Sequence, residues 1–149
     1  MKIRQANFKD LSKLVELFDL YRQFYGQNSD LEGANQFLLE RMEHGQSIIF
    51  IAEDPETQAF AGFTQLYPVF SSISMQRSYL LNDLYVKQNY RKQGIAKQLI
   101  NEAKSFTKTF GGKGLELSTS MHNKEARSLY GKEGFAEETE FLTYFWKSN

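Results

Sequence analysis

The sequence contains no cysteine, and this absence removes several kinds of chemistry at once. Disulfide bonds, thiolate metal sites and a covalent cysteine nucleophile are all excluded. Histidine is scarce as well: His44 and His122 stand alone, without the spacing that metal ligands require. We therefore assign no metal site.

The chain also lacks a net charge and a long apolar run. Lys and Arg together number 18, and Asp and Glu together number 18, so no overall field attracts nucleic acid or an anionic membrane. No apolar stretch approaches the roughly 18 residues that span a bilayer. Residues 1–4 lead directly into an expected strand, with no apolar signal-peptide core. We expect a cytoplasmic protein that binds neither nucleic acid nor membrane.

The chain does have enough apolar residues for a core. Its 149 residues, 41% of them hydrophobic, predict one domain over residues 1–149. Apolar spacing predicts helices from Asn7 to residue 25 and over residues 31–43, 94–110 and 124–133. It predicts strands over residues 1–6, 47–53, 59–67, 77–86, 115–120 and 140–147, with a break at Pro68 and a loop over residues 70–75. This order of elements combines hairpins with helical crossovers. We therefore predict an α/β fold (α+β) with a mixed sheet.

One stretch, from Leu80 to Ile100, joins a buried strand to an amphipathic helix through a short polar turn. The turn carries Arg91 and Lys92 and ends at Gly94. The first turn of a helix has unpaired backbone N–H groups and the positive end of the helix dipole, so a phosphate binds there readily. A residue without Cβ lets such a ligand approach the backbone.

Two segments carry a family resemblance. Residues 91–96, Arg-Lys-Gln-Gly-Ile-Ala, resemble the R/Q-x-x-G-x-G/A turn of the GNAT acetyltransferase superfamily. Residues 123–135 resemble that family's N-x-x-A-x-x-x-Y-x-x-x-G-F signature, in the expected order. Residues 81–86 and 67–72 further resemble its histone and polyamine acetyltransferase branch. The resemblance covers essentially the whole chain and implies a mostly antiparallel central sheet flanked by helices, with acetyl-CoA as acyl donor.

The resemblance also implies where acetyl-CoA binds. The backbone at the end of the strand would bond the pantetheine, and the turn would hold the pyrophosphate. The implied cofactor residues are Leu84, Tyr85, Val86, Arg91, Lys92, Gln93, Gly94, Ile95, Ala96, Lys97, Asn123 and Tyr130. The alternatives are a normally paired buried strand, an ordinary surface turn and, for Asn123, a helix N-cap alone.

Tyr130 and Asp83 are the candidate catalytic residues. By resemblance, the phenol of Tyr130 donates a proton to the departing CoA thiolate; the alternative is a core tyrosine that packs on Phe135. Relatives of the polyamine type place a Glu on the strand as base, but this chain has Asn82 at that position, and an amide is no base. Asp83 is adjacent, yet strand alternation points it to the opposite face. Either a bulge re-aims Asp83, or a water chain removes the proton.

The acceptor pocket is expected around the first helix-loop-helix, where aromatic faces and a carboxylate suit a cationic amine. The candidate residues are Tyr21, Phe24, Tyr25, Asp30, Phe70 and Asn82. The alternative is two amphipathic helices that simply bury their aromatic residues.

These observations predict an N-acetyltransferase in which a primary amine, of a small molecule or a peptide, attacks acetyl-CoA directly. A non-catalytic acyl-CoA sensor and a nucleotide-binding interaction domain are the alternatives. Apolar residues lie on both faces of the expected last strand, at Phe141, Tyr144, Phe145 and Trp146. Since a half-exposed edge strand normally alternates with polar residues, we expect a homodimer formed through this strand.

Overall fold

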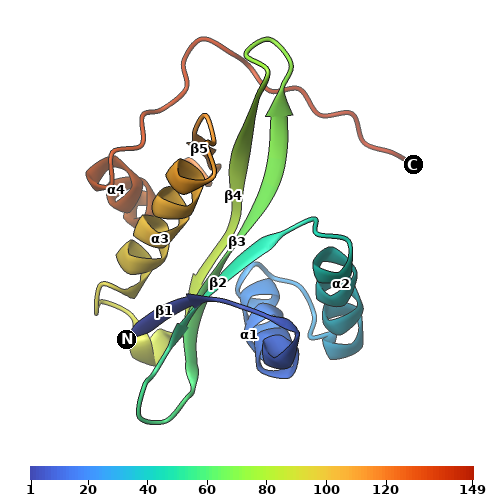
Figure 1. Ribbon diagram of the computed structural model, residues 1–149, viewed down its shortest axis with the longest axis vertical. Helices are drawn as coiled ribbons and strands as arrows, with labels where there is room; N and C mark the ends of the chain where they lie inside the picture. The colour runs from blue at the N-terminus through green and yellow to red at the C-terminus, as the bar shows by residue number, and fades with distance from the viewer. The chain divides into compact units, whose positions relative to one another are not determined.

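The computed structural model describes all residues from 1 to 149 (Figure 1). Its strands are β1 (Lys2–Gln5), β2 (Ile48–Glu53), β3 (Phe60–Ser71), β4 (Gln76–Val86) and β5 (Leu115–Glu116). Its helices are α1 (Leu11–Phe24), α2 (Leu31–Glu43), α3 (Ile95–Thr109) and α4 (Lys124–Lys132), with short 3-10 turns η1 (Phe8–Asp10) and η2 (Gln88–Tyr90). The chain divides into two compact units, Met1–Ser118 and Thr119–Asn149.

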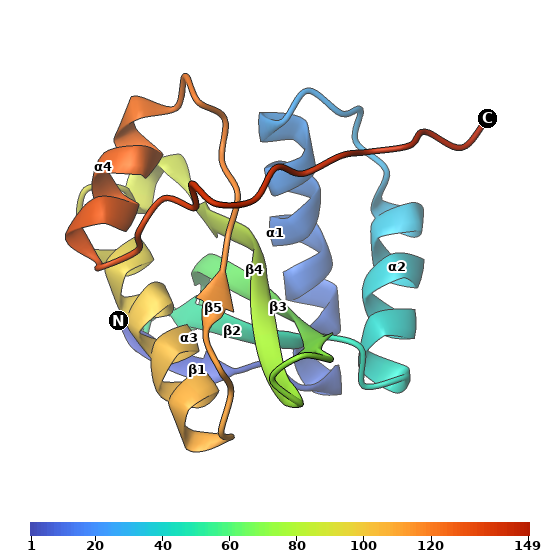
Figure 2. The same cartoon turned by 90° about the horizontal axis from the view of Figure 1, so that it is seen from above.

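The first unit is built on one five-stranded sheet in the order β1-β2-β3-β4-β5. The neighbours from β1 to β4 pair antiparallel, and only β4 and β5 pair parallel. Helices α1 and α2 cover one face of this sheet and α3 covers the other, as both ribbon views show (Figures 1 and 2). The expected mixed, mostly antiparallel sheet flanked by helices is therefore confirmed.

Both faces of the sheet are buried. On one face, Leu14 and Leu17 of α1 and Leu38 of α2 are fully buried together with Phe63 of β3. On the other face, the ring of Phe106 of α3 packs edge-on against the rings of Phe50 and Tyr79. Because β2 and β3 are covered on both sides, they appear in the sequence as nearly continuous apolar runs rather than alternating ones.

A network of ion pairs fixes the start of α1 to the sheet edge. Asn7 and Asp10 form a capping box at η1. The Arg4 guanidinium makes two bonds of 2.8 Å to the carboxylate of Asp10 and a third, also 2.8 Å, to Glu53 of β2. Arg4 thereby holds the pKa values of both carboxyl groups below their ordinary range. The stabilisation from these pairs is present above the ordinary carboxyl pKa and is lost as the pH falls through the lowered values.

Strand β3 does not break at Pro68, as the sequence predicts, but continues to Ser71. The last pair between β2 and β3 is Ile48 with Leu66, so Pro68 lies where β3 has only β4 as a neighbour. A proline is tolerated there because the strand is an edge and the missing N–H breaks no ladder. The expected loop shortens to a turn over residues 72–75.

The predicted last strand over residues 140–147 is absent, and β5 ends at Glu116 rather than at residue 120. A strand needs a neighbour for its hydrogen bonds, and residues 135–149 pair with none. The large side chains of this C-terminal segment are between 75% and 88% exposed: Phe141, Leu142, Tyr144, Phe145 and Trp146. No helix of the chain has the length and apolar character needed to cross a bilayer.

Candidate active site

A β-bulge in β4 places two polar residues next to one pocket. Gln65 of β3 pairs with Asp83, whereas the next residue, Leu66, pairs with Leu81, so Asn82 is the extra residue. A bulge breaks the strict alternation of a strand and re-aims the residues beside it. As a result Asn82 and Asp83 both line the same pocket. The sequence left open whether a bulge exists here, and it does.

Asp83 is a buried carboxylate whose hydrogen-bond donors are all neutral. It is 3% exposed, and it accepts hydrogen bonds from Nε2 of Gln65, from the Tyr21 hydroxyl and, at 3.0 Å, from Nδ2 of Asn82. No cation pairs with it. Burial raises the pKa of Asp83 above its ordinary value, and the three hydrogen bonds lower it only in part. Such a group takes up a proton more readily than a carboxylate in water.

Gln65 and Tyr67 extend the hydrogen-bond network of Asp83, and the sequence analysis named neither of them as a site residue. Gln65 is fully buried and its amide group donates both to Asp83 and, at 3.1 Å, to the hydroxyl oxygen of Tyr67. Burial together with the nearby Asp83 raises the pKa values of Tyr21 and Tyr67. Both phenols therefore stay protonated at neutral pH and remain able to donate hydrogen bonds.

The pocket beside Asp83 lies within the first unit, between the helical pair and the sheet. Its volume is about 370 Å³, which suits a small organic molecule. Three of the expected acceptor residues, Tyr21, Asp30 and Asn82, line it. The remaining lining residues are Phe18, Arg22, Gly33, Ala34, Phe37, Tyr67 and Asp83.

The loop between α1 and α2 is held by Asp19, a buried residue of α1. The Asp19 carboxylate accepts hydrogen bonds from the backbone N–H of Asp30 (2.8 Å), from the Ser29 hydroxyl (2.7 Å) and from Gln23 (2.9 Å). Burial alone would raise the pKa of Asp19, but these bonds hold it below its ordinary value. The position of Asp30 in the pocket wall is thus fixed by the fold.

The far end of β4 has a free edge. The ladder between β4 and β5 stops at the pair of Leu80 with Glu116, so residues 84–86 have no strand neighbour on that side. On the other side β3 pairs with them as far as Val86. The Val86 carbonyl is already engaged, because it accepts a hydrogen bond of 2.9 Å from Nε of Arg91. Unpaired backbone groups at this edge can therefore bind a ligand laid along the strand.

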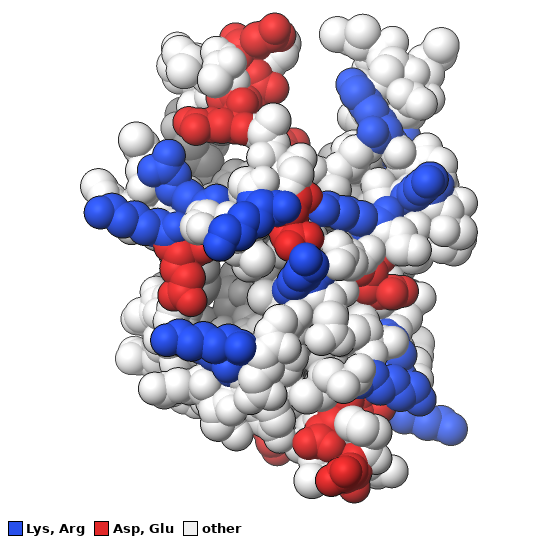
Figure 3. All heavy atoms as spheres, turned by 90° about the vertical axis from the view of Figure 1, so that its left-hand side faces the viewer, with Lys and Arg blue, Asp and Glu red and all other residues white.

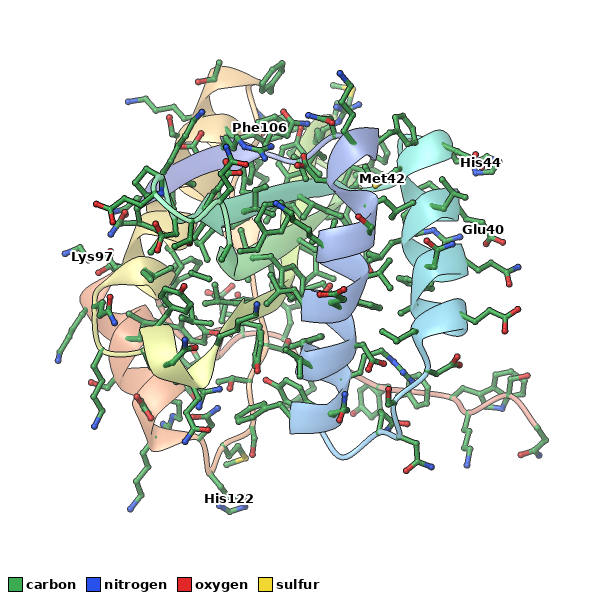
Figure 4. The ribbon with its side chains drawn as sticks, turned by 90° about the horizontal axis from the view of Figure 1, so that it is seen from below. Glu40, Met42, His44, Lys97, Phe106 and His122 are labelled. Carbon is green, nitrogen blue, oxygen red and sulfur yellow. The ribbon has the colours of Figure 1, made fainter.

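The turn after β4 has the geometry of an anion site. Lys92 (φ +59°) and Gly94 (φ +76°) are both left-handed, and α3 begins immediately afterwards without a side-chain cap. Helices α2 and α4, by contrast, start with capping side chains. The first N–H groups of α3 are therefore left for a ligand. Figure 4 shows Lys97 on this first turn.

Arg91 connects the turn to α1. Its guanidinium lies over the rings of Phe24 (5.1 Å) and Tyr85 (5.8 Å), while its Nε is tied to Val86. Phe24 therefore contacts the turn.

Three of the expected acceptor residues, Phe24, Tyr25 and Phe70, do not line the pocket beside Asp83. Phe70 is exposed near the end of the β3–β4 hairpin, with the Arg77 guanidinium 5.3 Å from its ring centroid.

The second unit contains the other two candidate residues. Asn123 caps α4, since its side-chain oxygen accepts a hydrogen bond of 3.1 Å from the N–H of Ala126. Tyr130 lies on α4, with its ring edge-on to that of Phe135 at 5.9 Å. The capping role left open for Asn123 is thus present.

No group of three or more potential metal ligands gathers anywhere in the chain. His44 lies at the end of α2, where its ring nitrogen Nδ1 is 2.8 Å from the Glu40 carbonyl oxygen (Figure 4). On the face drawn in Figure 3, basic side chains are interspersed with acidic ones. This face therefore carries no extended surface of one sign.

Comparison with known proteins places this chain in a family. The sequence pattern of the Acetyltransferase (GNAT) family matches residues 14–135. The chain is 49% identical over 144 residues to an uncharacterized N-acetyltransferase, YhfO, of Bacillus subtilis, covering 97% of this chain and 95% of the relative. It is 38% identical over 106 residues to a probable acetyltransferase of Haemophilus influenzae, covering 71% and 72% of the two chains. The crystal structure of a probable acetyltransferase superposes with a TM-score of 0.96 at 38% identity, over 100% of this chain and 99% of that one. This chain is an acetyltransferase of the GNAT family.

Proposed function

We propose that the protein transfers an acetyl group from acetyl-CoA to a primary amine by direct attack. The observation that carries this proposal is the arrangement along β4. The bulge brings Asp83 to a pocket of small-molecule size, and the three residues that follow form the free edge leading to the uncapped start of α3. One short segment thus supplies a base for the amine, Asp83, and a strand edge that binds acetyl-CoA.

Asp83 addresses the first chemical difficulty. An aliphatic ammonium with a pKa near 10.4 must lose a proton before its nitrogen can attack, which at pH 7 costs roughly 4.6 kcal/mol. Asp83, buried and without a cation, receives that proton. The nitrogen lone pair then attacks the thioester carbonyl carbon, and a backbone N–H near Leu84 to Val86 stabilises the developing oxyanion.

The second step breaks the carbon–sulfur bond. The nitrogen of the tetrahedral intermediate is positively charged, and it loses its extra proton to water as the intermediate collapses. The acetyl group stays on nitrogen as a neutral amide, and the electron pair of the carbon–sulfur bond leaves with sulfur as a thiolate. By the family motif, Tyr130 gives this thiolate its proton. Since the chain has no cysteine, the acetyl group does not pass through an enzyme thioester.

Gly94→Asp is expected to lower the affinity for acetyl-CoA at least about tenfold, a loss of 1.4 kcal/mol. The new carboxylate would lie at the start of α3, where it repels the pyrophosphate. A Cβ at this position meets no atom within 4 Å, so the cost to the fold comes from the positive φ of Gly94 and not from a clash. Titration calorimetry with acetyl-CoA measures the change.

The matched control is Gly94→Asn. Asn has a side chain of almost the same shape as that of Asp, adopts the same positive φ and carries no charge. It should bind acetyl-CoA clearly more tightly than Gly94→Asp does. If both variants bind as tightly as the wild type, the turn does not hold the pyrophosphate.

We also propose that the protein is a homodimer, with the exposed C-terminal segment at the interface. Five large apolar side chains within six residues are exposed there, and a patch of this kind commonly marks an interface. Light scattering should give twice the chain mass of 17.3 kDa across micromolar concentrations. A value equal to the chain mass would refute the dimer.

A further inference from the structure

The pocket beside Asp83 contains two carboxylates without a cationic partner. Asp83 is 3% exposed and lies at its base, whereas Asp30 is exposed and lies at its rim. Oδ1 of Asp30 accepts a hydrogen bond of 2.9 Å from the N–H of Gly33, but no cation neutralises its charge. A ligand with positive charge at both ends would therefore compensate both groups.

The one basic side chain in the wall is already committed elsewhere. Nη1 of Arg22 donates to the Asn28 carbonyl oxygen at 3.3 Å and lies 3.8 Å from the Asp19 carboxylate. It thus balances Asp19, which is buried, rather than Asp30 or Asp83. The pocket presents a net negative charge to its ligand.

The wall between the two carboxylates is aromatic. Phe18 and Phe37 stack with their ring centroids 5.8 Å apart, and Tyr21 and Tyr67 also line the pocket. Aromatic faces accept both a methylene chain and an ammonium group. An anionic acceptor, by contrast, would be repelled by the two carboxylates of the pocket.

We infer that the acceptor is a small unbranched aliphatic diamine. Its reacting nitrogen lies at Asp83, its methylene chain lies along the aromatic wall, and its second nitrogen, which stays protonated, pairs with Asp30. The inference rests on the proposed function and narrows it to one class of amine. The pocket volume of about 370 Å³ accommodates such a molecule.

The test compares diaminobutane with aminobutanol and n-butylamine, together with the analogues one carbon shorter and longer, under saturating acetyl-CoA. The three compounds present an ammonium, a hydroxyl or a methyl group at the second end. We expect kcat/KM to be highest for the diamine, by about two- to fivefold over the alcohol, which is what an exposed ion pair contributes. Asp30→Asn should remove this preference by raising KM for the diamine more than KM for aminobutanol.

Asn keeps the cap of α2, and Glu32→Gln is the matched control, because Glu32 lies in the same first turn and does not line the pocket. Thermal unfolding of both variants verifies that they fold. Equal kcat/KM values for diamine and alcohol in the wild type, or an equal loss on both in Asp30→Asn, would overturn the inference while leaving the acetyltransferase proposal intact. Turnover of peptide amines alone would do the same. Failure to release CoA with any amine would instead remove the proposed function.

Discussion

Asp83→Asn is expected to lower kcat/KM for the amine acceptor at pH 7 by about 10³-fold, within the range that a positioned acid or base supplies. The substitution keeps the shape of the side chain and removes its ability to take up a proton. The acceptor must then enter the reaction as the small fraction that is already deprotonated in solution. A steady-state assay of free CoA thiol measures the loss.

The pH dependence separates a base from a packing residue. In the variant, kcat/KM should rise about tenfold per pH unit towards the amine pKa, because the neutral amine is then supplied by the solvent. In the wild type, kcat/KM should stop rising at a lower pH than in the variant, because Asp83 accepts the proton as soon as it is ionised. Asp54→Asn is the control, since Asp54 caps a turn of the β2–β3 hairpin and does not line the pocket. A variant that keeps wild-type activity at pH 7 would show that Asp83 is structural.

Stability gives a second readout of the same residue. Burial raises the pKa of Asp83 in the folded protein, so the unfolded state releases this proton at lower pH than the folded state does. The contribution of Asp83 to stability is therefore fully present below the unfolded pKa and is lost as the pH rises through the folded one. Denaturant unfolding should show the variant gaining stability relative to the wild type as the pH rises above the ordinary carboxyl pKa of about 4.

Tyr130→Phe is expected to lower the single-turnover rate by about 10²-fold while the KM for acetyl-CoA changes little. The substitution keeps the ring that packs against Phe135 and removes only the hydroxyl. If the phenol protonates the leaving thiolate, the loss falls on the transition state and not on ground-state binding. Single-turnover rates are the readout because slow product release can hide a chemical defect in kcat.

The rate loss in Tyr130→Phe is limited by the chemistry of the leaving group. A thiol has an unperturbed pKa near 8.5, so a thiolate leaves tolerably well even without an acid. An unchanged melting temperature would show that packing survives. If the variant turns over at the wild-type single-turnover rate, the proton comes from water and Tyr130 serves packing alone.

The turn at residues 91–96 could be predicted from sequence because its determinants are local. A glycine with positive φ, a helix that starts without a cap and two adjacent basic residues all lie within six positions. The helices and the β2–β3 hairpin were predictable for the same reason, since apolar spacing and turn residues lie next to one another in the chain.

The bulge at Asn82 could not be predicted, because it depends on which residues of β3 face which residues of β4. The Asn82–Asp83 pair has the same sequence with or without an extra residue in the ladder. Gln65 gave a signal that was available: it is a long polar residue in the apolar stretch from Phe60 to Leu66. A buried amide of this kind needs partners, and here its partners are Asp83 and Tyr67.

In the C-terminal segment, the sequence predicted a strand that the structure does not contain. Aromatic residues at Phe141, Tyr144 and Phe145 favour a strand by propensity. Strand formation, however, depends on a neighbour that accepts the backbone hydrogen bonds, and no strand of this chain pairs with the segment. Strand propensity alone was therefore not sufficient to predict the structure of this segment.

The most direct test of the proposed function is the release of free CoA from acetyl-CoA across a panel of amines, with mass spectrometry of the acceptor. Amine-dependent CoA release, matched by an acceptor heavier by one acetyl group, is the predicted result. Tight acetyl-CoA binding with no CoA release on any amine would contradict it and identify an acyl-CoA sensor. Equal binding of nucleotides with and without pantetheine would contradict it in favour of a nucleotide-binding domain.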